Sequence, residues 1–510
     1  MSDYAAIVPG DEYDKKLLEN VRPPGWDNPR PSGRYNLVVI GAGTAGLVTA
    51  AIAAGLGAKV ALIEKHFMGG DCLNVGCVPS KALIRASRAW ADVRRTAEFG
   101  IHIPTGVKYD FSEAMARMRR LRTRLSPTDS AQRFKNLGVD VFFGEGRFTG
   151  PDTIQVEDAI LRFKKAAVCT GAQAAAPAIP GMQEVGYLTN ETLFSVTELP
   201  PRLCVIGAGP IGAEMAQTFA RFGSRVTLME KMGRLLPRED LDASTIVQAQ
   251  MVKDGVQFIF DATIVRVEAR GSDKIVHYET HRRAAELVVD EILVGIGRAP
   301  NVEGLGLENV NVEYDGSGVK VNQRLRTSNP QIYAAGDVCF PFKFTHTADA
   351  MAQIVIQNAL IPHPFGLGYA RTDSLVIPWC TYTEPEVAHV GLYEANAAAR
   401  GLEVETFTYN LDEVDRAILD GQTDGFARIH VKKGTDKILG ATIVAAHAGE
   451  MISEFTVLMK SGQGLKTLTS TIHPYPTQAE VIKKAGNAWR KAHFTESQKN
   501  ILKKWFAWTR

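Results

Sequence analysis

Residues 35–46 read Tyr-Asn-Leu-Val-Val-Ile-Gly-Ala-Gly-Thr-Ala-Gly, an apolar strand that runs directly into a glycine-rich turn. An alanine-rich segment with helical character follows, and a second apolar strand then ends on Glu64. Strand, glycine turn, helix, strand and terminal acid form the dinucleotide-binding pattern, in which a pyrophosphate lies at the helix N-terminus. We expect Gly41 to make the tight turn, Gly43 to admit the ligand and Gly46 to permit close helix packing. Glu64 is expected to accept the ribose hydroxyls.

The same pattern recurs 166 residues later, so the sequence predicts two bound nucleotides. Its glycines are Gly207, Gly209 and Gly212, and the following apolar strand ends on Glu230. A carboxylate at that place repels a 2′-phosphate and binds hydroxyls, which favours NADH. NADPH stays possible because two cationic residues, Lys231 and Arg234, follow Glu230 within four positions.

A pair of thiols stands between the two units. Residues 69–81 read Gly-Gly-Asp-Cys-Leu-Asn-Val-Gly-Cys-Val-Pro-Ser-Lys, with Cys72 and Cys77 separated by four residues. Such a pair can cycle between dithiol and disulfide, and a nearby cation such as Lys81 lowers a thiol pKa. Five steps of a regular helix rise about 7.5 Å, more than the roughly 7 Å that a disulfide spans between Cα atoms. We therefore expect a distorted turn at a redox centre; the plainer alternative is two buried free cysteines.

Composition limits the remaining classes. The 510 residues suffice for three or four domains, and a net charge of +2 does not favour a nucleic-acid binder. Cys169, Cys204, Cys339 and Cys380 lie in apolar surroundings and are interpreted as packing residues, a pattern that suits a reducing compartment, the cytoplasm. No segment has the signature of a signal peptide or a membrane span. Residues 1–34 are polar and predict a loosely ordered arm, with clasping of a partner as the alternative.

Several shorter motifs complete the pattern. Residues 332–337 form an apolar strand that ends on Gly336 and Asp337, which suits a carboxylate on a flavin ribityl chain. Gly297 and Arg298 follow another apolar strand and are expected to close the second nucleotide domain. The arginine-rich run at 117–124 is interpreted as a solvated helix face.

In this order the motifs resemble the flavoprotein disulfide reductases, which include dihydrolipoamide dehydrogenase, glutathione reductase and mercuric reductase. The resemblance spans about residues 35–485 and looks closest to the mercuric reductase core. It depends on Gly-Cys-Val-Pro-Ser-Lys at 76–81, Arg-Thr-Ser-Asn-Pro at 326–330, Ile-Pro-Trp at 377–379 and Thr-Glu-Pro-Glu-Val at 383–387.

The resemblance implies an α/β fold with two Rossmann-like domains, for FAD and NAD, and an α+β C-terminal dimerisation domain. The chain would act as a homodimer with FAD and NADH as cofactors. The implied segments are an N-terminal extension (1–34), the first FAD segment (35–185), the NAD(P) domain (186–303), a central FAD segment (304–374), the dimerisation domain (375–485) and a basic aromatic tail (486–510).

Roles carry over by position. Cys77 would be the flavin-proximal thiol and Cys72 the interchange thiol that meets the acceptor. Lys81 and Glu214 look like the family's ion pair beside the flavin, and Thr345 opens a helix under the flavin's pyrimidine edge. The expected cofactor-contacting positions are Gly41, Gly43, Gly46, Glu64, Lys65, Gly70, Lys81, Gly146, Thr170, Gly171, Gly207, Gly209, Gly212, Glu230, Gly297, Arg298, Gly336, Asp337, Thr345, His346 and Ala348.

The C-terminal motif departs from the disulfide-reducing members. Those enzymes place a histidine base before Pro-Thr-x-x-Glu, whereas aligning Glu480 here puts Tyr475 at the base position and His473 two residues early. A phenol with a pKa near 10 is a poor base at neutral pH. Mercuric reductases also carry tyrosine here, yet this chain has no terminal cysteine pair and no N-terminal Cys-x-x-Cys domain.

The leading hypothesis is thus an NAD(P)H-dependent flavoenzyme that reduces Hg(II) or another thiol-reactive acceptor through Cys72 and Cys77. The alternatives are a dihydrolipoamide dehydrogenase-like enzyme that uses His473, and a low-turnover redox-sensing or membrane-associated flavoprotein. The tail holds eight basic residues and one acid over 483–510, together with several aromatics. Docking on the dimer partner is the favoured interpretation, and weak contact with an anionic membrane surface is the alternative.

Overall fold

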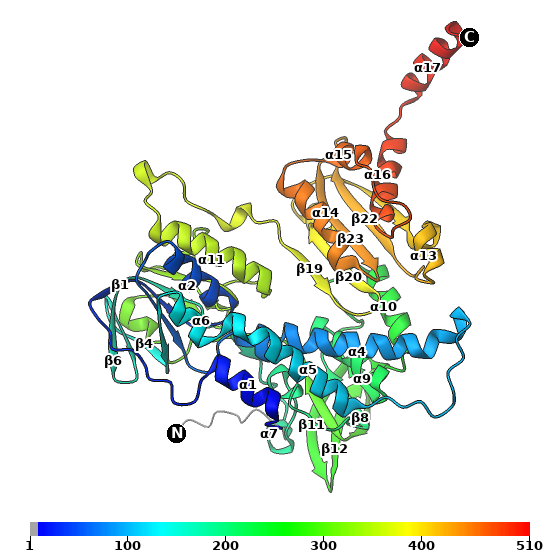
Figure 1. The fold of residues 1–510 in the computed structure, drawn as a ribbon. Coiled ribbons are helices and arrows are strands. Elements are labelled where there is room, and N and C mark those ends of the chain that lie inside the picture. Colours follow the sequence, from blue (N-terminus) through cyan, green and yellow to red (C-terminus); the bar gives the residue numbers. More distant parts are fainter. Residues whose placement is uncertain (1–8) are drawn as a thin grey trace. The chain divides into compact units, whose positions relative to one another are not determined.

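The computed structural model describes residues 9–510, which form two compact units. The first comprises residues up to 233 together with 255–375, and the second comprises 234–254 together with 376–510. Figure 1 shows the elements of both units. Residues 234–254 of the expected NAD(P) segment thus belong to the second unit.

The first unit contains a seven-stranded sheet with β1 at its centre. β1 runs parallel to β2 on one side and to β6 on the other, and β18 (Ile332–Ala334) also pairs with β6 in parallel. Strands buried on both faces carry nearly continuous apolar runs, as β1 and β2 do. The order of the other six strands is β3 (Val139–Phe143), β2 (Val60–Glu64), β1 (Arg34–Ile40), β6 (Ala159–Val168), β5 (Thr153–Val156) and β4 (Gly146–Gly150).

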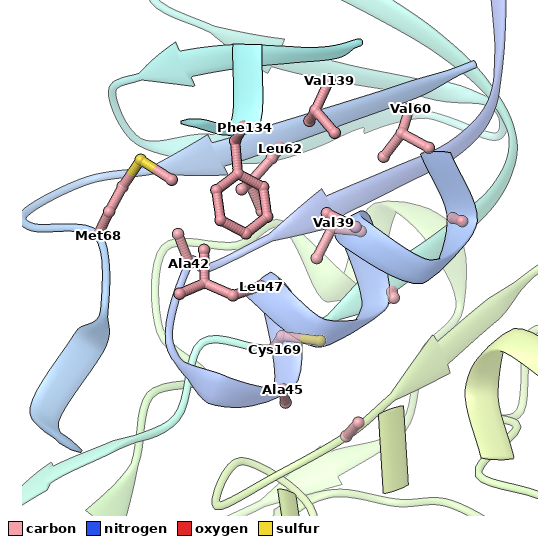
Figure 2. Packing of buried hydrophobic residues seen from close by; sticks show 14 of the residues in the cluster. Val39, Ala42, Ala45, Leu47, Val60, Leu62, Met68, Phe134, Val139 and Cys169 are labelled. Atoms are coloured by element: carbon pink, nitrogen blue, oxygen red, sulfur yellow. The ribbon is translucent and has the colours of Figure 1, made fainter. Parts of the chain in front are cut away.

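Helices α2 (Thr44–Gly55) and α11 (Thr345–Leu360) contact one another beside this sheet. Figure 2 shows part of the core, where Val39, Leu62 and Phe134 pack with Leu47 of α2. Because apolar side chains fill this space, the turn between β1 and α2 is held against a rigid core.

A second parallel sheet carries the second glycine turn. Its strands are in the order β10 (Gln257–Ile259), β9 (Arg225–Met229), β8 (Arg202–Ile206) and β14 (Glu291–Val294). Helix α9 (Pro210–Phe222) follows β8, as expected for a Rossmann unit. Three antiparallel strands, β11 (Ala262–Arg270), β12 (Asp273–Thr280) and β13 (Arg283–Val289), form a separate sheet.

The expectation of a loosely ordered N-terminal arm is wrong for residues 9–34; residues 1–8 lie outside the described part of the chain. Residues 12–21 form helix α1 (Glu12–Val21), which packs on α5 (Phe111–Leu125). Farther along the arm, Trp26 Nε1 donates to the carbonyl of Val141, and Asn28 exchanges two hydrogen bonds with Phe143. The arm is thus bonded into the first unit along its length.

The interpretation of residues 117–124 as a solvated face is also wrong in part. Arg120 and Arg124 are exposed, but Arg119 and Arg122 are buried and pair with Asp11 and Asp14 of the arm. A buried guanidinium needs such a partner, because an unpaired charge is costly to remove from water.

The second unit is built on a five-stranded antiparallel sheet in the order β19, β20, β23, β22, β21. Helices α14 (Ala448–Lys460) and α16 (Glu480–Ala492) pack against it. Helix α10 (Leu241–Lys253) joins this unit because Glu239 accepts from Trp379 and Tyr393, and Asp240 and Asp242 pair with Arg428. The strands are β19 (Pro378–Thr381), β20 (Glu386–Gly391), β21 (Val404–Asn410), β22 (Phe426–Lys432) and β23 (Ile438–Ala445).

The chain ends in helix α17 (Glu496–Trp508), none of whose residues is buried. Thr495 caps its first turn reciprocally with Gln498. Within residues 9–510 no helix combines the length and hydropathy that a membrane crossing requires.

Candidate active site

The first glycine turn has the geometry that the sequence predicts. Gly41 has a φ of +100°, and a Cβ there would overlap the carbonyl of Cys169. A Cβ at Gly46 would overlap the carbonyl oxygen of Gly41, so the close helix start requires glycine. Gly43 is the N-cap of α2 and has no side chain to cap it, so the first N–H groups of α2 can bind an external anion.

The second glycine turn has a similar geometry. A Cβ at Gly207 would lie 2.6 Å from the carbonyl oxygen of Gly295, and one at Gly212 would overlap the Gly207 carbonyl oxygen. Gly209 is the N-cap of α9, and a Cβ there would meet nothing within 4 Å. A ligand can therefore approach the backbone at this turn closely.

The two terminal acids are held alike. Glu64 accepts hydrogen bonds from the N–H groups of Ala42 and His66, both at 2.7 Å. Glu230 accepts from the N–H groups of Ala208 at 2.7 Å and Met232 at 2.9 Å. Each carboxylate oxygen has a second lone pair, which is available to a ribose hydroxyl. Burial raises the pKa of Glu64, and the backbone bonds oppose that effect.

These features fit two dinucleotides, FAD at the first turn and NAD(P)H at the second. The N-termini of α2 and α9 have no capping side chain, so their free N–H groups can bind the pyrophosphates. The carboxylates of Glu64 and Glu230 are positioned to accept hydrogen bonds from the ribose hydroxyls. The segment with the two cysteines, residues 69–81, is called the redox segment below. Gly70 in this segment has a φ of +55°, and a Cβ there would lie 2.6 Å from the Cα of Gly43. Only glycine therefore lets the redox segment pack so closely against the first glycine turn.

Asp337 and Arg298 lie together, which corrects the expected place of Arg298. Arg298 follows β14 of the second nucleotide sheet along the chain. Its own strand β15 (Arg298–Pro300), however, pairs with β7 (Ala172–Ala174) and not with that sheet. Its guanidinium bonds to Asp71 and to the carbonyl of Ala172, and its Nε lies 3.5 Å from Asp337. The Arg298 side chain thus lies between Asp337, the carboxylate expected at the flavin, and Asp71, the residue before Cys72. It does not close the second nucleotide domain, as the sequence had suggested.

The remaining expected cofactor positions divide into ligand-side and packing positions. Thr170 and Asn301 exchange two hydrogen bonds, which fixes the loop at Gly171. Gly146 lies in β4, and a Cβ there would press on Ile40 and Ile63, so this glycine serves sheet packing. The carbonyl of Lys65 accepts a hydrogen bond from Arg22.

The redox segment is distorted, as the disulfide argument predicts. Helix α3 (Gly70–Asn74) ends before the thiol pair is complete, and α4 (Cys77–Arg95) starts at the second cysteine. A Cβ at Gly76 would lie 2.7 Å from the carbonyl oxygen of Asp71, so the bend between the helices requires glycine. Cys72 is half-buried and Cys77 exposed.

The two thiols have opposite pKa shifts. The hydrogen bond with Cys72 lowers the pKa of Cys77 to about 6, helped by Thr345 and by the charge of Lys81. The same hydrogen bond, with burial, raises the pKa of Cys72. Cys77 Sγ lies 3.4 Å from Thr345 Oγ1, the first residue of α11. Within the pair, the thiolate is therefore favoured on Cys77 over Cys72.

Lys81 and Glu214 meet as the resemblance implies. Lys81 Nζ lies 2.8 Å from Glu214 Oε2, and the Glu214 side chain is only 6% exposed. Lys81 lies one helical turn after Cys77 on α4, and Glu214 lies on the first turns of α9. His346 stacks on Phe344 with ring centroids 5.4 Å apart, and Ala348 is buried in the core.

The C-terminal candidates lie in the second unit. His473 Nε2 lies 2.9 Å from Glu454 Oε1, and its Nδ1 lies 3.4 Å from the carbonyl of Thr471. Tyr475 is 69% exposed and its hydroxyl donates to Asp415 at 2.8 Å, which raises the pKa of the phenol. Glu480 opens α16, where its Oε1 lies 4.0 Å from Lys484.

Sequence reasoning missed three contacts of the site: Asp71 with Arg298, Thr345 with Cys77, and Arg122 with the carbonyl of Asn74. Each joins residues at least 48 positions apart. None of the three has a signal in the sequence. A signal exists only for the neighbouring ion pairs, since the three-residue spacing of Asp11 and Asp14 matches that of Arg119 and Arg122.

Known proteins share this architecture. The chain is 34% identical to a mercuric reductase of Staphylococcus aureus over 495 residues, covering 94% of this chain and 89% of that protein. It is 33% identical to a dihydrolipoyl dehydrogenase of Bacillus subtilis over 473 residues, covering 89% and 98%.

Solved structures agree. The HOCl-induced flavoprotein disulfide reductase RclA from Escherichia coli superposes with a TM-score of 0.78 at 29% identity, covering 89% of this chain and 99% of that chain. LpdA from Mycobacterium tuberculosis gives a TM-score of 0.80 at 26% identity, with the same coverage.

Two family models cover most of the chain. Residues 35–353 match the pyridine nucleotide-disulphide oxidoreductases, and residues 377–486 match the dimerisation domain of the same group. The glycine turns, the fixed acids and the thiol pair described above lie within the first match. The chain therefore belongs to the pyridine nucleotide-disulphide oxidoreductase family of flavoproteins, which bind FAD and NAD(P)H, and its dimerisation domain indicates a homodimer.

Proposed function

We propose that the chain reduces a thiophilic metal ion, with Hg(II) as the reference acceptor, using NADH and the Cys72–Cys77 pair. The observation that carries this proposal is the state of the C-terminal motif. Aligning Pro476, Thr477 and Glu480 with the family motif puts Tyr475 at the base position. His473 has a hydrogen-bond partner at each ring nitrogen, the carbonyl of Thr471 and the carboxylate of Glu454. No imidazole is thus offered at the place where disulfide-reducing members of the family need one.

The two candidate reactions differ in their proton balance. Reduction of a disulfide by NADH consumes a proton and gives two thiols and NAD⁺. Reduction of Hg(II) to Hg(0) by NADH gives NAD⁺ and releases one proton. Only the first needs a group that delivers protons to a leaving thiolate. A tyrosine whose pKa is raised by Asp415 suits the second reaction.

The thiol pair has the properties that a metal acceptor requires. Bound FAD supplies the transfer of two electrons from the nicotinamide to the thiol site. Cys77, with its lowered pKa, offers a thiolate at neutral pH, and Cys72 shares its proton with it. Thiolates are the preferred ligands of soft metal ions. Among residues 9–510 no group of three or more His, Cys, Asp or Glu side chains could hold a metal, so we assign metal exchange to the two thiols.

The comparisons support a metal acceptor without deciding between metals. Mercuric reductases are among the relatives, and RclA was also solved as a Cu(II) complex, at 28% identity and a TM-score of 0.79. The dihydrolipoyl dehydrogenase relatives keep lipoamide as the second candidate acceptor, which would require His473 to leave Glu454.

NADH is the proposed reductant. Glu230 is fixed at the end of β9 by two backbone N–H groups, where a 2′-phosphate would meet its negative charge. Lys231 is exposed, and the guanidinium of Arg234 donates to the carbonyl of Pro237. The scattered packing cysteines favour the cytoplasm as the compartment.

The deciding experiment measures NADH oxidation by the purified protein with thiol-complexed Hg(II), with Cu(II) and with lipoamide under identical conditions. We expect turnover with a metal ion to exceed turnover with lipoamide by at least about tenfold, because proton transfer by a positioned base contributes roughly 10²–10⁴-fold. Cys72→Ser and Cys77→Ser should each abolish metal-dependent turnover. Fast lipoamide turnover that is lost in His473→Gln would instead establish the disulfide reductase. Normal FAD reduction by NADH with no turnover on any acceptor would establish the low-turnover redox sensor.

We also propose that α17 docks on the partner subunit, with weak contact to an anionic membrane surface as the alternative. Ile501, Trp505 and Trp508 recur at helical spacing on one face, and all three are more than half exposed. The helix also carries three lysines against Glu496, a combination typical of interfacial helices. Docking predicts that Trp505→Ser with Trp508→Ser weakens the dimer, and that the full-length protein and the variant behave alike with phosphatidylserine vesicles. Sedimentation of the full-length protein with the vesicles that is lost in the variant would assign the face to a membrane surface instead.

A further inference from the structure

The N-terminal arm lies outside the matched family models but contacts the redox segment. The first match starts at residue 35, whereas the described part of the arm starts at residue 9. Asp11 caps α1 by accepting from the N–H of Asp14, and the helix packs on α5. Both acids face α5, where Arg119 and Arg122 lie three residues apart.

Arg122 connects the arm to the residue midway between the cysteines. Its Nη2 donates to Asp14 Oδ1 at 2.8 Å, and its Nη1 donates to the carbonyl oxygen of Asn74 at 2.9 Å. The Arg122 and Asp14 side chains are only 5% and 1% exposed. Two fully buried charges thus meet at the main chain of the redox segment.

Asn74 lies just before the bend and is hydrogen-bonded through both its main chain and its side chain. It is the last residue of α3, so α3 itself supplies no N–H for its carbonyl. Its side-chain Nδ2 donates to the carbonyls of Met68 and Gly70, at 3.0 and 2.8 Å. Its main chain and side chain therefore hold the two ends of the segment that carries Cys72.

The end of α1 holds the same segment a second time. The N–H of Met68 donates to the carbonyl of Val21 at 3.0 Å. Arg22 Nη1 donates to the carbonyls of Lys65 and His66, at 2.8 and 2.7 Å. The arm is thus bonded to both sides of the loop between Glu64 and the thiols.

We infer that the arm is a positioning device for the redox-active cysteines, in which Asp14 orients Arg122 and Arg122 fixes the Asn74 carbonyl and so the separation of Cys72 and Cys77. A charged donor makes a stronger hydrogen bond than a neutral one, and a two-pronged guanidinium fixes direction as well as distance. Fixing the main chain between two thiols raises their effective concentration toward each other, which favours the disulfide. The inference rests on the proposed redox role of Cys72 and Cys77.

The chain supplies a matched control. Arg119 Nε donates to Asp11 Oδ2 at 2.6 Å, between the same two helices as the Asp14–Arg122 pair. Its side chain is also buried, at 8% exposure, but its hydrogen bond runs to Asp11 of the arm and not to the redox segment. Arg119→Met therefore removes a docking contact of the arm and leaves Arg122 in place.

The test compares full-length wild type, Arg122→Met, Arg122→Lys, Asp14→Asn and Arg119→Met. The equilibrium between disulfide and dithiol is measured in dithiothreitol redox buffers, with alkylation of Cys72 and Cys77 read by mass spectrometry. We expect Arg122→Met and Asp14→Asn to move the equilibrium about tenfold toward the dithiol, which is about 30 mV for a two-electron couple. Arg122→Lys should recover part of the shift, and Arg119→Met should stay within about twofold of wild type.

Three outcomes overturn the inference: no variant shifts, all variants shift equally, or Arg119→Met alone shifts. FAD content and thermal melting identify a variant that fails to fold. If Arg122→Met fails to fold, the redox equilibria of Asp14→Asn and Arg122→Lys, whose side chains are closer in size to the original ones, decide whether the inference holds. If the wild-type protein forms no Cys72–Cys77 disulfide in any buffer, the proposed redox role fails instead. The two failures are thereby distinguishable.

Discussion

Lys81 Nζ lies 2.8 Å from Glu214 Oε2, and this ion pair joins the helix that starts at Cys77 to the helix that starts at the second glycine turn. The pair links the thiol site to the nicotinamide-side Rossmann unit within one compact unit. Its two members act on Cys77 with opposite signs, because Lys81 lowers the pKa of that thiol and Glu214 raises it.

Neutralising the two members separately should move the Cys77 thiolate in opposite directions. In Lys81→Met the apparent pKa of Cys77 should rise, by roughly one unit for a partly screened charge at this range. In Glu214→Gln it should fall by a smaller amount, because Lys81 then acts unopposed. The measurement is the thiolate-to-flavin charge-transfer absorbance of the two-electron-reduced protein as a function of pH. Shifts of the same sign in both variants would contradict this account.

The same absorbance should depend on Cys72. Since the hydrogen bond with Cys72 is the largest cause that lowers the pKa of Cys77 to about 6, the band should be complete well above pH 6 and be lost as the pH falls through about 6. In Cys72→Ala this donor is removed, and the midpoint should rise toward the ordinary cysteine value of about 8.5. Cys77→Ser should show no band at any pH, and a band that persists there would assign the flavin-proximal thiol to Cys72.

The two glycine turns should be separable by alanine substitution. Gly46→Ala places a Cβ on the Gly41 carbonyl and should expel FAD and destabilise the protein by about 1–3 kcal/mol. Gly212→Ala makes the same clash at Gly207 and should keep FAD while slowing its reduction by NADH. Gly55→Ala lies in α2 with nothing within 4 Å of the new Cβ and serves as the control. Flavin content and stopped-flow reduction distinguish the three, and an intact Gly46→Ala holoenzyme would exclude the assigned role of that turn.

Local patterns predicted the parts of the fold that depend on local chemistry. The strand and glycine turn at Gly41 and their repeat at Gly207 follow from apolar runs and from backbone that only glycine accepts. The distorted bend between Cys72 and Cys77 followed from the reach of a disulfide. These inferences need only residues that are close in sequence.

The parts that were missed depend on long-range pairing. Asp14 and Arg122 are 108 positions apart. The polar, proline-rich composition of the arm suggested looseness, because composition alone does not show which distant residues the arm contacts. The arginine run was interpreted as solvated because five charges in eight residues usually face water. Only the structure shows that Arg119 and Arg122 point to the side that the arm covers.

Removing the charge of Glu230 should weaken the proposed preference for NADH. In Glu230→Ala the repulsion of a 2′-phosphate is lost together with the ribose acceptor, so the ratio of kcat/KM for NADH over NADPH should fall by about tenfold, a difference of about 1.4 kcal/mol. The matched Glu64→Ala change should leave that ratio unchanged and reduce FAD content instead. A ratio that stays constant in Glu230→Ala would show that NADPH is excluded by other residues.

Tyr475→His tests whether one side chain decides the acceptor class. The substitution restores the imidazole that disulfide-reducing relatives carry before Pro-Thr-x-x-Glu, with Glu480 at the spacing of their glutamate. Lipoamide turnover should rise by at least about tenfold, since a positioned general base contributes roughly 10²–10⁴-fold, and the gain should be lost as the pH falls through the imidazole pKa. Tyr475→Phe removes the hydrogen bond to Asp415 without adding a base, so it should leave lipoamide turnover at background. If Tyr475→His gains nothing while metal reduction stays intact, the acceptor is selected elsewhere, and the bond between His473 and Glu454 becomes the next contact to break.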